Sequence, residues 1–226
     1  MFHYEYVSKK EAAPYRDEFL DITHEVQNQL RDKFTFSFDF IGSSARNMIT
    51  CDYTTNKGFD FDMNYHINDP DEAFSAKEIK HFVMDAINRV AVPRGYAYCE
   101  DSTRVITLKK RSSFSNKIEY SCDFALVNDW TDDNGKVHQQ YIRFQKNQGS
   151  YVWADQPDGY HLEKKVNWIK SHSLWEEVLD LYLDKKNYNT DPDKKSRALY
   201  AETIHEVAQR NGFKEGKPYL SFILQV

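Results

Sequence analysis

Cysteine is scarce in this sequence. The three cysteines, Cys51, Cys99 and Cys122, form an odd set, and their spacing fits no zinc-binding pattern. A framework of disulfide bonds is therefore not expected. Sparse cysteine without such a framework is typical of a protein in a reducing compartment, so we expect a cytoplasmic protein.

Long hydrophobic runs are also missing. No apolar stretch approaches the roughly 20 residues that a membrane-spanning helix needs. Residues 1–10 include Glu5, Lys9 and Lys10 and lack the apolar core of a secretory signal. We therefore expect no membrane partner.

The sequence has no excess of basic residues. Its 30 Lys and Arg residues face 35 Asp and Glu residues, which gives a formal net charge of −5. Proteins that bind long nucleic acids usually present a basic stripe, whereas the basic residues here form only short clusters. A small nucleotide or a short RNA end is thus a more suitable ligand than a long duplex.

Aromatic residues, in contrast, are abundant, with 15 Phe and 15 Tyr, and they reveal the folding pattern. Phe34, Phe36, Phe38 and Phe40 alternate strictly, which predicts a strand. Before them, Phe19, Ile22, Val26 and Leu30 recur at helical spacing. After Gly159 the pattern becomes helical. We predict an α+β protein with a mixed β-sheet and flanking helices at 1–155, followed by a mostly helical region at 156–226.

Capping motifs suggest where the helices begin. Ser8-x-x-Glu11 and Ser75-x-x-Glu78 have the form of capping boxes, although Pro14 leaves a later start open for the first helix. In the C-terminal region, Ser173-x-x-Glu176 and Asp191-Pro192 predict two further starts. Strands are expected at about 58–67, 104–109, 117–127, 138–144 and 151–153.

Two aspartates alternate with apolar residues in the expected strand at 58–67. Neighbouring side chains of a strand point to opposite faces, so Asp60 and Asp62 share one face while Phe59, Phe61 and Met63 turn to the core. Two close carboxylates repel each other unless a cation lies between them, and Mg²⁺ prefers oxygen ligands. Taken alone, this pattern also fits a half-exposed strand with two solvated aspartates.

A third carboxylate, Asp123, lies in the expected strand at 117–127. Aspartate is depleted in strands, and the residues around Asp123, 122–127, are otherwise apolar. If the two strands are neighbours, Asp123 joins Asp60 and Asp62 on one face. An aspartate at an exposed strand end is the alternative interpretation.

A short polar turn, Gly42-Ser43-Ser44-Ala45-Arg46, follows the aromatic strand. Glycine permits a tight bend. The backbone N–H groups and serine hydroxyls of such a turn can hold phosphate oxygens. A plain serine cap of a short helix would leave the same sequence.

Together, the turn, the paired aspartates and the third carboxylate resemble the pattern of the polymerase-β-like nucleotidyltransferase superfamily. The matching residues are Ile41-Gly42-Ser43, then residues 59–63, then Cys122-Asp123-Phe124. The resemblance covers residues 35–127. The interval from Ser43 to Asp60 is longer than usual in that family, and we expect an extended loop at 52–56 to contain the excess.

The resemblance implies a nucleotidyltransferase that uses two Mg²⁺ or Mn²⁺ ions and a nucleoside triphosphate. Asp60 and Asp62 would hold both ions, and Asp123 the ion nearer the attacking hydroxyl. Gly42 and Ser43 would hold the β- and γ-phosphates, with Ser44 and Arg46 as further candidates. A distal lysine usually completes such a site, and Lys165 is our choice among Lys164, Lys165 and Lys170.

The acceptor and the oligomeric state cannot be read from the sequence. A small molecule, RNA, a protein or a second nucleotide could each supply the hydroxyl. A non-enzymatic module that binds a nucleotide or a partner on the same fold is the main alternative. A calcium-stabilised structural protein ranks last, because the Asp60 and Asp62 pair lacks the loop spacing of calcium motifs.

Overall fold

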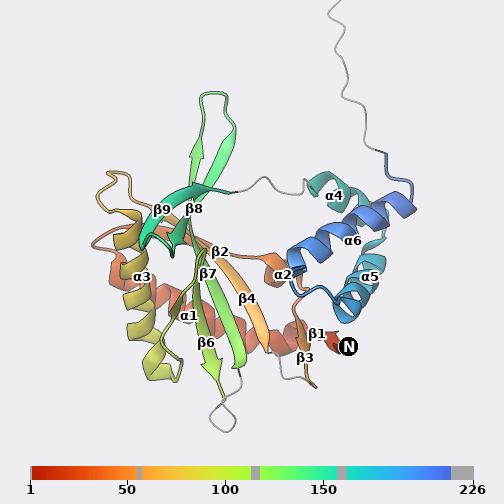
Figure 1. Cartoon of the computed structure of the whole chain (residues 1–226), viewed down its shortest axis with the longest axis horizontal. Coiled ribbons are helices and arrows are strands. Elements are labelled where there is room, and N and C mark those ends of the chain that lie inside the picture. The colour runs from red at the N-terminus through yellow and green to blue at the C-terminus, as the bar shows by residue number, and fades with distance from the viewer. Residues whose placement is uncertain (1, 55–57, 113–117, 157–161, 215–226) are drawn as a thin grey trace, which may run out of the picture. The chain divides into compact units, whose positions relative to one another are not determined.

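The computed structural model describes residues 2–54, 58–112, 118–156 and 162–214 (Figure 1). The chain divides into two compact units, residues 2–157 and residues 158–226. None of the described helices combines the length and the apolar character that crossing a bilayer requires.

A mixed sheet forms the centre of the first unit (Figure 1). Its strands follow one another in the order β2 (Thr35–Ile41), β4 (Phe59–Asn68), β7 (Ile118–Thr131), β6 (Ile106–Arg111) and β5 (Glu100–Asp101). The far part of β7 pairs with β8 (Val137–Gln145), and β8 pairs with β9 (Ser150–Asp155). The pair β4–β7 is parallel and the other pairs are antiparallel. The predicted α+β class with a mixed sheet is confirmed.

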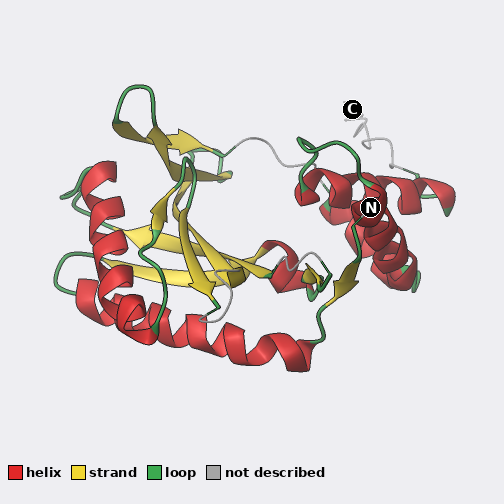
Figure 2. Cartoon of the chain, turned by 60° about the horizontal axis from the view of Figure 1, so that its bottom comes forward, coloured by secondary structure: helices red, strands yellow, loops and turns green. Residues whose placement is uncertain are grey.

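Two helices, α1 (Lys9–Leu30) and α3 (Ala76–Ala91), cover the apolar face of this sheet (Figure 2). Phe19 and Ile22 of α1 are fully buried in the same core as Phe61 of β4 and Val83 of α3. The strict alternation in β4 places one parity of residues in this core. The residues of the other parity, which include the two aspartates, lie on the opposite face.

The predicted capping motifs start both helices. The Ser8 hydroxyl accepts a hydrogen bond from the Glu11 backbone N–H at 3.2 Å, so α1 begins at its cap and runs through Pro14. At Ser75 both halves of the capping box are present. The short 3₁₀ helix η1 (Val92–Arg94) and Gly95, with φ +83°, then end α3. Such caps contribute about 1 kcal/mol each.

A small ribbon that the sequence analysis missed joins the N-terminal segment to the long interval before β4. Here β1 (Tyr4–Tyr6) pairs with β3 (Thr50–Asp52). Asp52 is fully buried and accepts hydrogen bonds from the His3 backbone N–H at 3.0 Å and from Thr54 Oγ1 at 2.7 Å. The expected loop at 52–56 is therefore wrong at Asp52, which ends a strand, and residues 55–57 lie outside the described residues.

One histidine side chain forms hydrogen bonds that connect strands β2, β4 and β7. His66 of β4 contacts Asp39 of β2 through Nε2 and Asp129 of β7 through Nδ1, each at 2.5 Å. Burial lowers the pKa of His66, but the hydrogen bonds and charges of the two carboxylates outweigh it, so the pKa is raised. Only the protonated ring can donate through both nitrogens.

The raised pKa of His66 predicts a pH-dependent contribution to stability. The contribution should be complete below the unfolded pKa of about 6.5 and should be lost as the pH rises through the higher folded pKa. We expect His66→Gln to lower the melting temperature more at about pH 6 than at about pH 9. Thermal unfolding of the wild type and of His66→Gln across this pH range measures the difference in melting temperature. An equal difference at all pH values would contradict a protonated His66 that donates to both Asp39 and Asp129.

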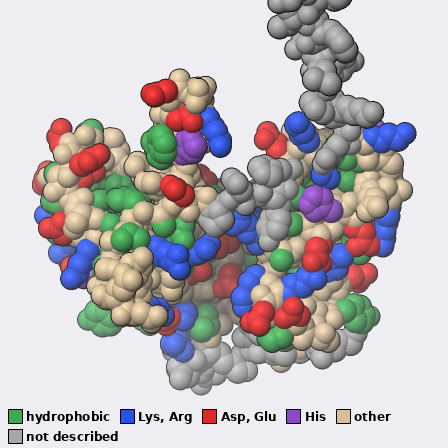
Figure 3. All heavy atoms as spheres, turned by 45° about the horizontal axis from the view of Figure 1, so that its top comes forward, with side chains coloured by type: hydrophobic (Ala, Val, Ile, Leu, Met, Phe, Trp, Pro, Cys, Tyr) green, Lys and Arg blue, Asp and Glu red, His purple; other side chains and the backbone are tan. Residues whose placement is uncertain are grey.

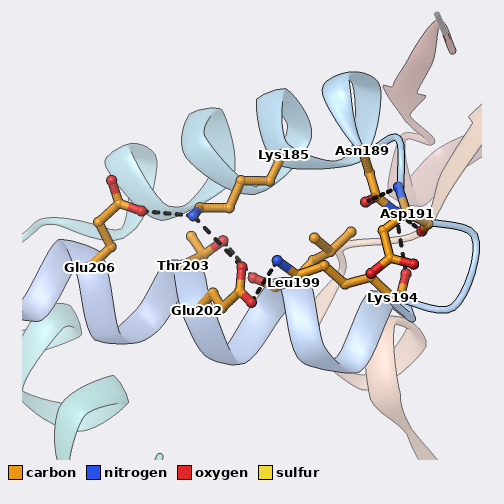
Figure 4. A network of polar contacts seen from close by, with 8 residues as sticks. All are labelled: Lys185, Asn189, Asp191, Lys194, Leu199, Glu202, Thr203 and Glu206. Carbon is orange, nitrogen blue, oxygen red and sulfur yellow. Dashed lines mark hydrogen bonds and ion pairs between the residues drawn. The ribbon is translucent and has the colours of Figure 1, made fainter.

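The second unit contains α4 (Glu163–Ser171), α5 (Trp175–Tyr188) and α6 (Ser196–Arg210), as the predicted helical region requires. An ion-pair network joins α5 to α6 (Figure 4). Lys185 Nζ lies 2.7 Å from Glu206 Oε2, and Lys194 Nζ lies 2.7 Å from Glu202 Oε1. Exposed ion pairs are worth little, so the buried side chains Ile169, Val178 and Ile204 account for more of the stability.

Two predicted helix starts in this unit are wrong. Ser173 has a left-handed backbone, with φ +59°, and its N–H bonds to Lys170 O, so it closes α4 and α5 begins after Leu174. Asp191 forms a turn instead of a helix start. Its carboxylate accepts from the Asp193 N–H at 2.9 Å, and α6 begins only at Ser196. At Asp191 a hydrogen bond between the side chain and the nearby backbone competes with the cap. At Ser173 the left-handed backbone replaces the extended conformation that a cap residue adopts.

Candidate active site

Three predicted site residues lie on two neighbouring strands. Strands β4 and β7 pair in parallel, and Asp62 lies directly opposite Asp123 in the register. Asp60 lies opposite Ser121, one pleat away on the same face. Directly opposite residues of neighbouring strands are about 5 Å apart. The structure thus brings the three carboxylates to one face, with Asp60 exposed and Asp62 and Asp123 half-buried.

The crowding of negative charge shows in the pKa values. Burial, followed by the charges of Asp123 and Asp60, raises the pKa of Asp62 to about 6, against the opposing charge of Arg46. Burial also raises the pKa of Asp123, with a further contribution from Asp60, although a hydrogen bond from Thr107 opposes the shift. A divalent cation would relieve this repulsion.

The donor set suits Mg²⁺ or Mn²⁺, because all three side chains supply carboxylate oxygens on one face. Within the described residues, however, no three His, Cys, Asp or Glu side chains are arranged around a common point that would hold a metal ion. Asp60 accepts a hydrogen bond from the Ser121 hydroxyl, and Asp123 Oδ1 accepts one from Thr107 Oγ1 at 2.6 Å. Each of these hydrogen bonds engages one carboxylate oxygen, so the second oxygen of Asp60 and of Asp123 can serve as a ligand for a cation.

The glycine turn adjoins Asp62. Gly42 begins the short helix α2 (Gly42–Arg46) and has a φ of +62°. A Cβ atom built on Gly42 would lie 2.6 Å from Asp62 Oδ2. Only a residue without a side chain permits the backbone to approach the carboxylate so closely. The glycine turn and strand β4, which carries the paired aspartates, are therefore neighbours, as expected.

The other turn residues differ in their surroundings. Ser44 is buried, and its hydroxyl donates to Ile41 O at 2.6 Å and to Asp62 O at 3.3 Å. The bond to Asp62 O attaches the turn to β4, and the two hydrogen bonds occupy the hydroxyl of Ser44 within the fold. Ser43 is half-exposed. Arg46 is close enough for its charge to lower the pKa of Asp62. Phosphate binding by these residues stays a prediction.

Lys165 belongs to the second unit. It lies on α4, and its ammonium group lies over the ring of Phe213, 5.4 Å from the centroid. The ammonium group of Lys170, on the same helix, lies over the ring of Trp175, 4.9 Å from the centroid. Neither contact decides which lysine binds a triphosphate, so the choice of Lys165 stays a prediction.

Strand β6 adds residues that the sequence analysis overlooked. In the register, Thr107 lies opposite Asp123, and Lys109 lies opposite Ser121. Lys109 Nζ contacts Glu100 Oε2 of β5 at 2.6 Å, and its charge lowers the pKa of Asp123. The alternation of residues 106–109 indicates which side chains share a face, but only the pairing with β7 shows which residue each one meets.

Charges of both signs are interspersed on the face of the molecule drawn in Figure 3. This agrees with the composition, in which acidic residues slightly outnumber basic ones. The carboxylates of Asp60, Asp62 and Asp123 thus form a local acidic cluster on the sheet.

Solved structures share this architecture. The STING-associated CdnE c-di-GMP synthase from Capnocytophaga granulosa is 16% identical, with a TM-score of 0.55 over 91% of this chain and 62% of that one. The CD-NTase CdnG from Bradyrhizobium diazoefficiens, in complex with GTP, is 13% identical, with a TM-score of 0.54 over 87% of this chain and 64% of that one. The chain has the nucleotidyltransferase fold.

A third structure with the nucleotidyltransferase fold, Escherichia coli DncV bound to 3'-deoxy GTP, is 12% identical. Its TM-score is 0.54, over 90% of this chain and 54% of that one. This chain therefore spans less than two thirds of the length of these proteins. No family model matches the sequence, and no curated protein does. At these identities the likeness establishes the nucleotidyltransferase fold and confirms the resemblance at that level.

Proposed function

We propose that this chain is a metal-dependent nucleotidyltransferase. It would transfer a nucleoside monophosphate from a nucleoside triphosphate to a hydroxyl acceptor and release pyrophosphate. The observation that carries the proposal is the register pair Asp62 and Asp123, with Asp60 one pleat away and Gly42 against Asp62. The fold supports it, since solved structures with this fold include complexes with GTP and with 3'-deoxy GTP.

Asp60, Asp62 and Asp123 would hold Mg²⁺ or Mn²⁺. When bound, such ions neutralise the charge that develops on the phosphate oxygens. Asp123 would also take the proton of the acceptor hydroxyl. In the transfer, the hydroxyl oxygen forms a bond to the α-phosphorus while the bond to the bridging oxygen breaks, and pyrophosphate departs with that oxygen.

The turn would position the triphosphate. Gly42 and Ser43 would bind the β- and γ-phosphates, with Ser44 and Arg46 beside them, and Lys165 would supply a further charge. Bringing reactants into line in this way accounts for much of the catalysis expected in such a site. Residues 1–155 would form the catalytic core and residues 156–226 a helical region.

The acceptor is open between a small molecule, RNA, a protein and a second nucleotide. One similar structure is a c-di-GMP synthase, so a second nucleotide is the first acceptor to test. The alternative, a non-enzymatic module that binds a nucleotide or partner, explains the crowded carboxylates less well. A binding module has no need for charges whose mutual repulsion destabilises the sheet.

Incubation with each α-labelled triphosphate and Mg²⁺ or Mn²⁺, with and without cell extract, tests the proposal. We expect release of unlabelled pyrophosphate and label in a new product, dependent on the metal. Label without extract would identify a nucleotide acceptor, and label only with extract would indicate RNA, a protein or a small molecule. Metal-independent nucleotide binding without any transfer would instead favour the binding module.

A further inference from the structure

Two hydroxyl side chains, those of Thr107 and Ser121, lie next to two of the three carboxylates, those of Asp123 and Asp60. Thr107, Asp123 and Asp62 form one row across β6, β7 and β4, and Lys109, Ser121 and Asp60 form the next. In each row one carboxylate, Asp123 in the first and Asp60 in the second, therefore lies beside a hydroxyl on a neighbouring strand. This arrangement depends on the sheet register and is fixed by the backbone pairing.

The two hydroxyls bind the carboxylates directly. Thr107 Oγ1 donates to Asp123 Oδ1 at 2.6 Å, across the β6–β7 pair. Ser121 Oγ donates to Asp60 Oδ1 across the β7–β4 pair. In each case one carboxylate oxygen is engaged and the second oxygen remains as an acceptor for another ligand.

Both hydroxyls lie on strand residues with little freedom. Ser121 is buried, with 8% of its surface exposed, and Thr107 is a half-buried β-branched residue with a stiff χ1 angle. A carboxylate held by such a donor loses rotamer freedom before any cation arrives. Less conformational entropy then remains to be lost when the cation binds.

We propose that Thr107 and Ser121 are positioning residues, which hold the carboxylates of Asp123 and Asp60 for divalent cations. The inference rests on the proposed function. Neither hydroxyl touches substrate or metal; each acts through the carboxylate that it orients. Partners of this kind typically change metal affinity by about 10- to 100-fold when they are removed.

The test uses the full chain and measures Mn²⁺ binding by electron paramagnetic resonance, with a non-hydrolysable nucleoside triphosphate at saturation. Thr107→Val keeps the β-branched shape and removes the hydroxyl, whereas Thr107→Ser keeps the hydroxyl. We expect Thr107→Val to weaken Mn²⁺ binding about 10- to 100-fold and Thr107→Ser to bind nearly as the wild type does. Thermal unfolding without metal serves as the control for folding.

Ser121→Ala tests the same inference at Asp60, and keeps it testable if Thr107→Val folds poorly. Equal Mn²⁺ affinity in wild type, Thr107→Val and Ser121→Ala would overturn the positioning role and leave the proposed function standing. A wild-type protein that binds no Mn²⁺ with the triphosphate would overturn the proposed function itself, and the inference with it.

Discussion

Asp62→Asn should abolish nucleotide transfer while the protein stays folded. The substitution retains the side-chain volume but removes the charge that faces Asp123 across β4 and β7. Loss of one metal-binding carboxylate removes several kcal/mol of transition-state stabilisation, so we expect pyrophosphate release to fall about a thousandfold or more. The melting temperature should stay the same or rise, because a neutral side chain removes the cost of burying a charge and the repulsion from Asp123 and Asp60, which together raise the pKa of Asp62.

Asp21→Asn provides the matched control for this substitution. Asp21 is an exposed residue of α1, so the same chemical change there should leave both transfer and stability unaltered. A kinetic assay of pyrophosphate release and thermal unfolding separate the two effects. A stable Asp62→Asn protein with full transfer activity would remove Asp62 from the chemistry, and a large loss of stability with activity kept would assign it to the fold.

Gly42→Ala should have the second large effect. The new methyl group would lie 2.6 Å from Asp62 Oδ2, and the backbone at Gly42 has a φ of +62°. The left-handed backbone alone costs about 1–2 kcal/mol for a residue with a side chain. The clash adds to this by displacing the Asp62 carboxylate. We expect pyrophosphate release to fall by about 100-fold, since a displacement of about 1 Å has that effect on positioned groups.

Gly135→Ala isolates the contribution of the backbone. Gly135 also has a positive φ, +78°, but a Cβ atom there would meet nothing within 4 Å. This variant should lose stability by a similar backbone term and keep its activity. If Gly42→Ala and Gly135→Ala behaved alike in thermal unfolding and in the transfer assay, the close approach of the turn to Asp62 would have no functional meaning.

The faces of the strands could be predicted from the sequence, but their partners could not. Alternation along residues 59–65 shows that Asp60 and Asp62 share a face, because the side-chain period of a strand is two. Their meeting with Asp123 depends on a parallel pairing between segments about 60 residues apart. From periodicity alone this pairing was only a condition, and the resemblance to a known pattern supplied the pairing.

Thr107 shows the same limit more sharply. Nothing in residues 106–111 marks its hydroxyl, and its contact with Asp123 arises only from the register of β6 on β7. The ribbon of β1 and β3 was missed because its strands have three residues each, too few for an alternating pattern. The helix starts predicted at Ser173 and Asp191 were wrong because serine and aspartate favour turns as well as helix caps.

Crystals of the full chain grown with Mn²⁺ and a non-hydrolysable triphosphate would test the central claim most directly. Anomalous diffraction from manganese locates the ions without reference to any assay. We expect manganese between the carboxylates of Asp60, Asp62 and Asp123, with the triphosphate at Gly42 and Ser43. A bound triphosphate with manganese elsewhere, and with no ion at these three carboxylates, would contradict the account.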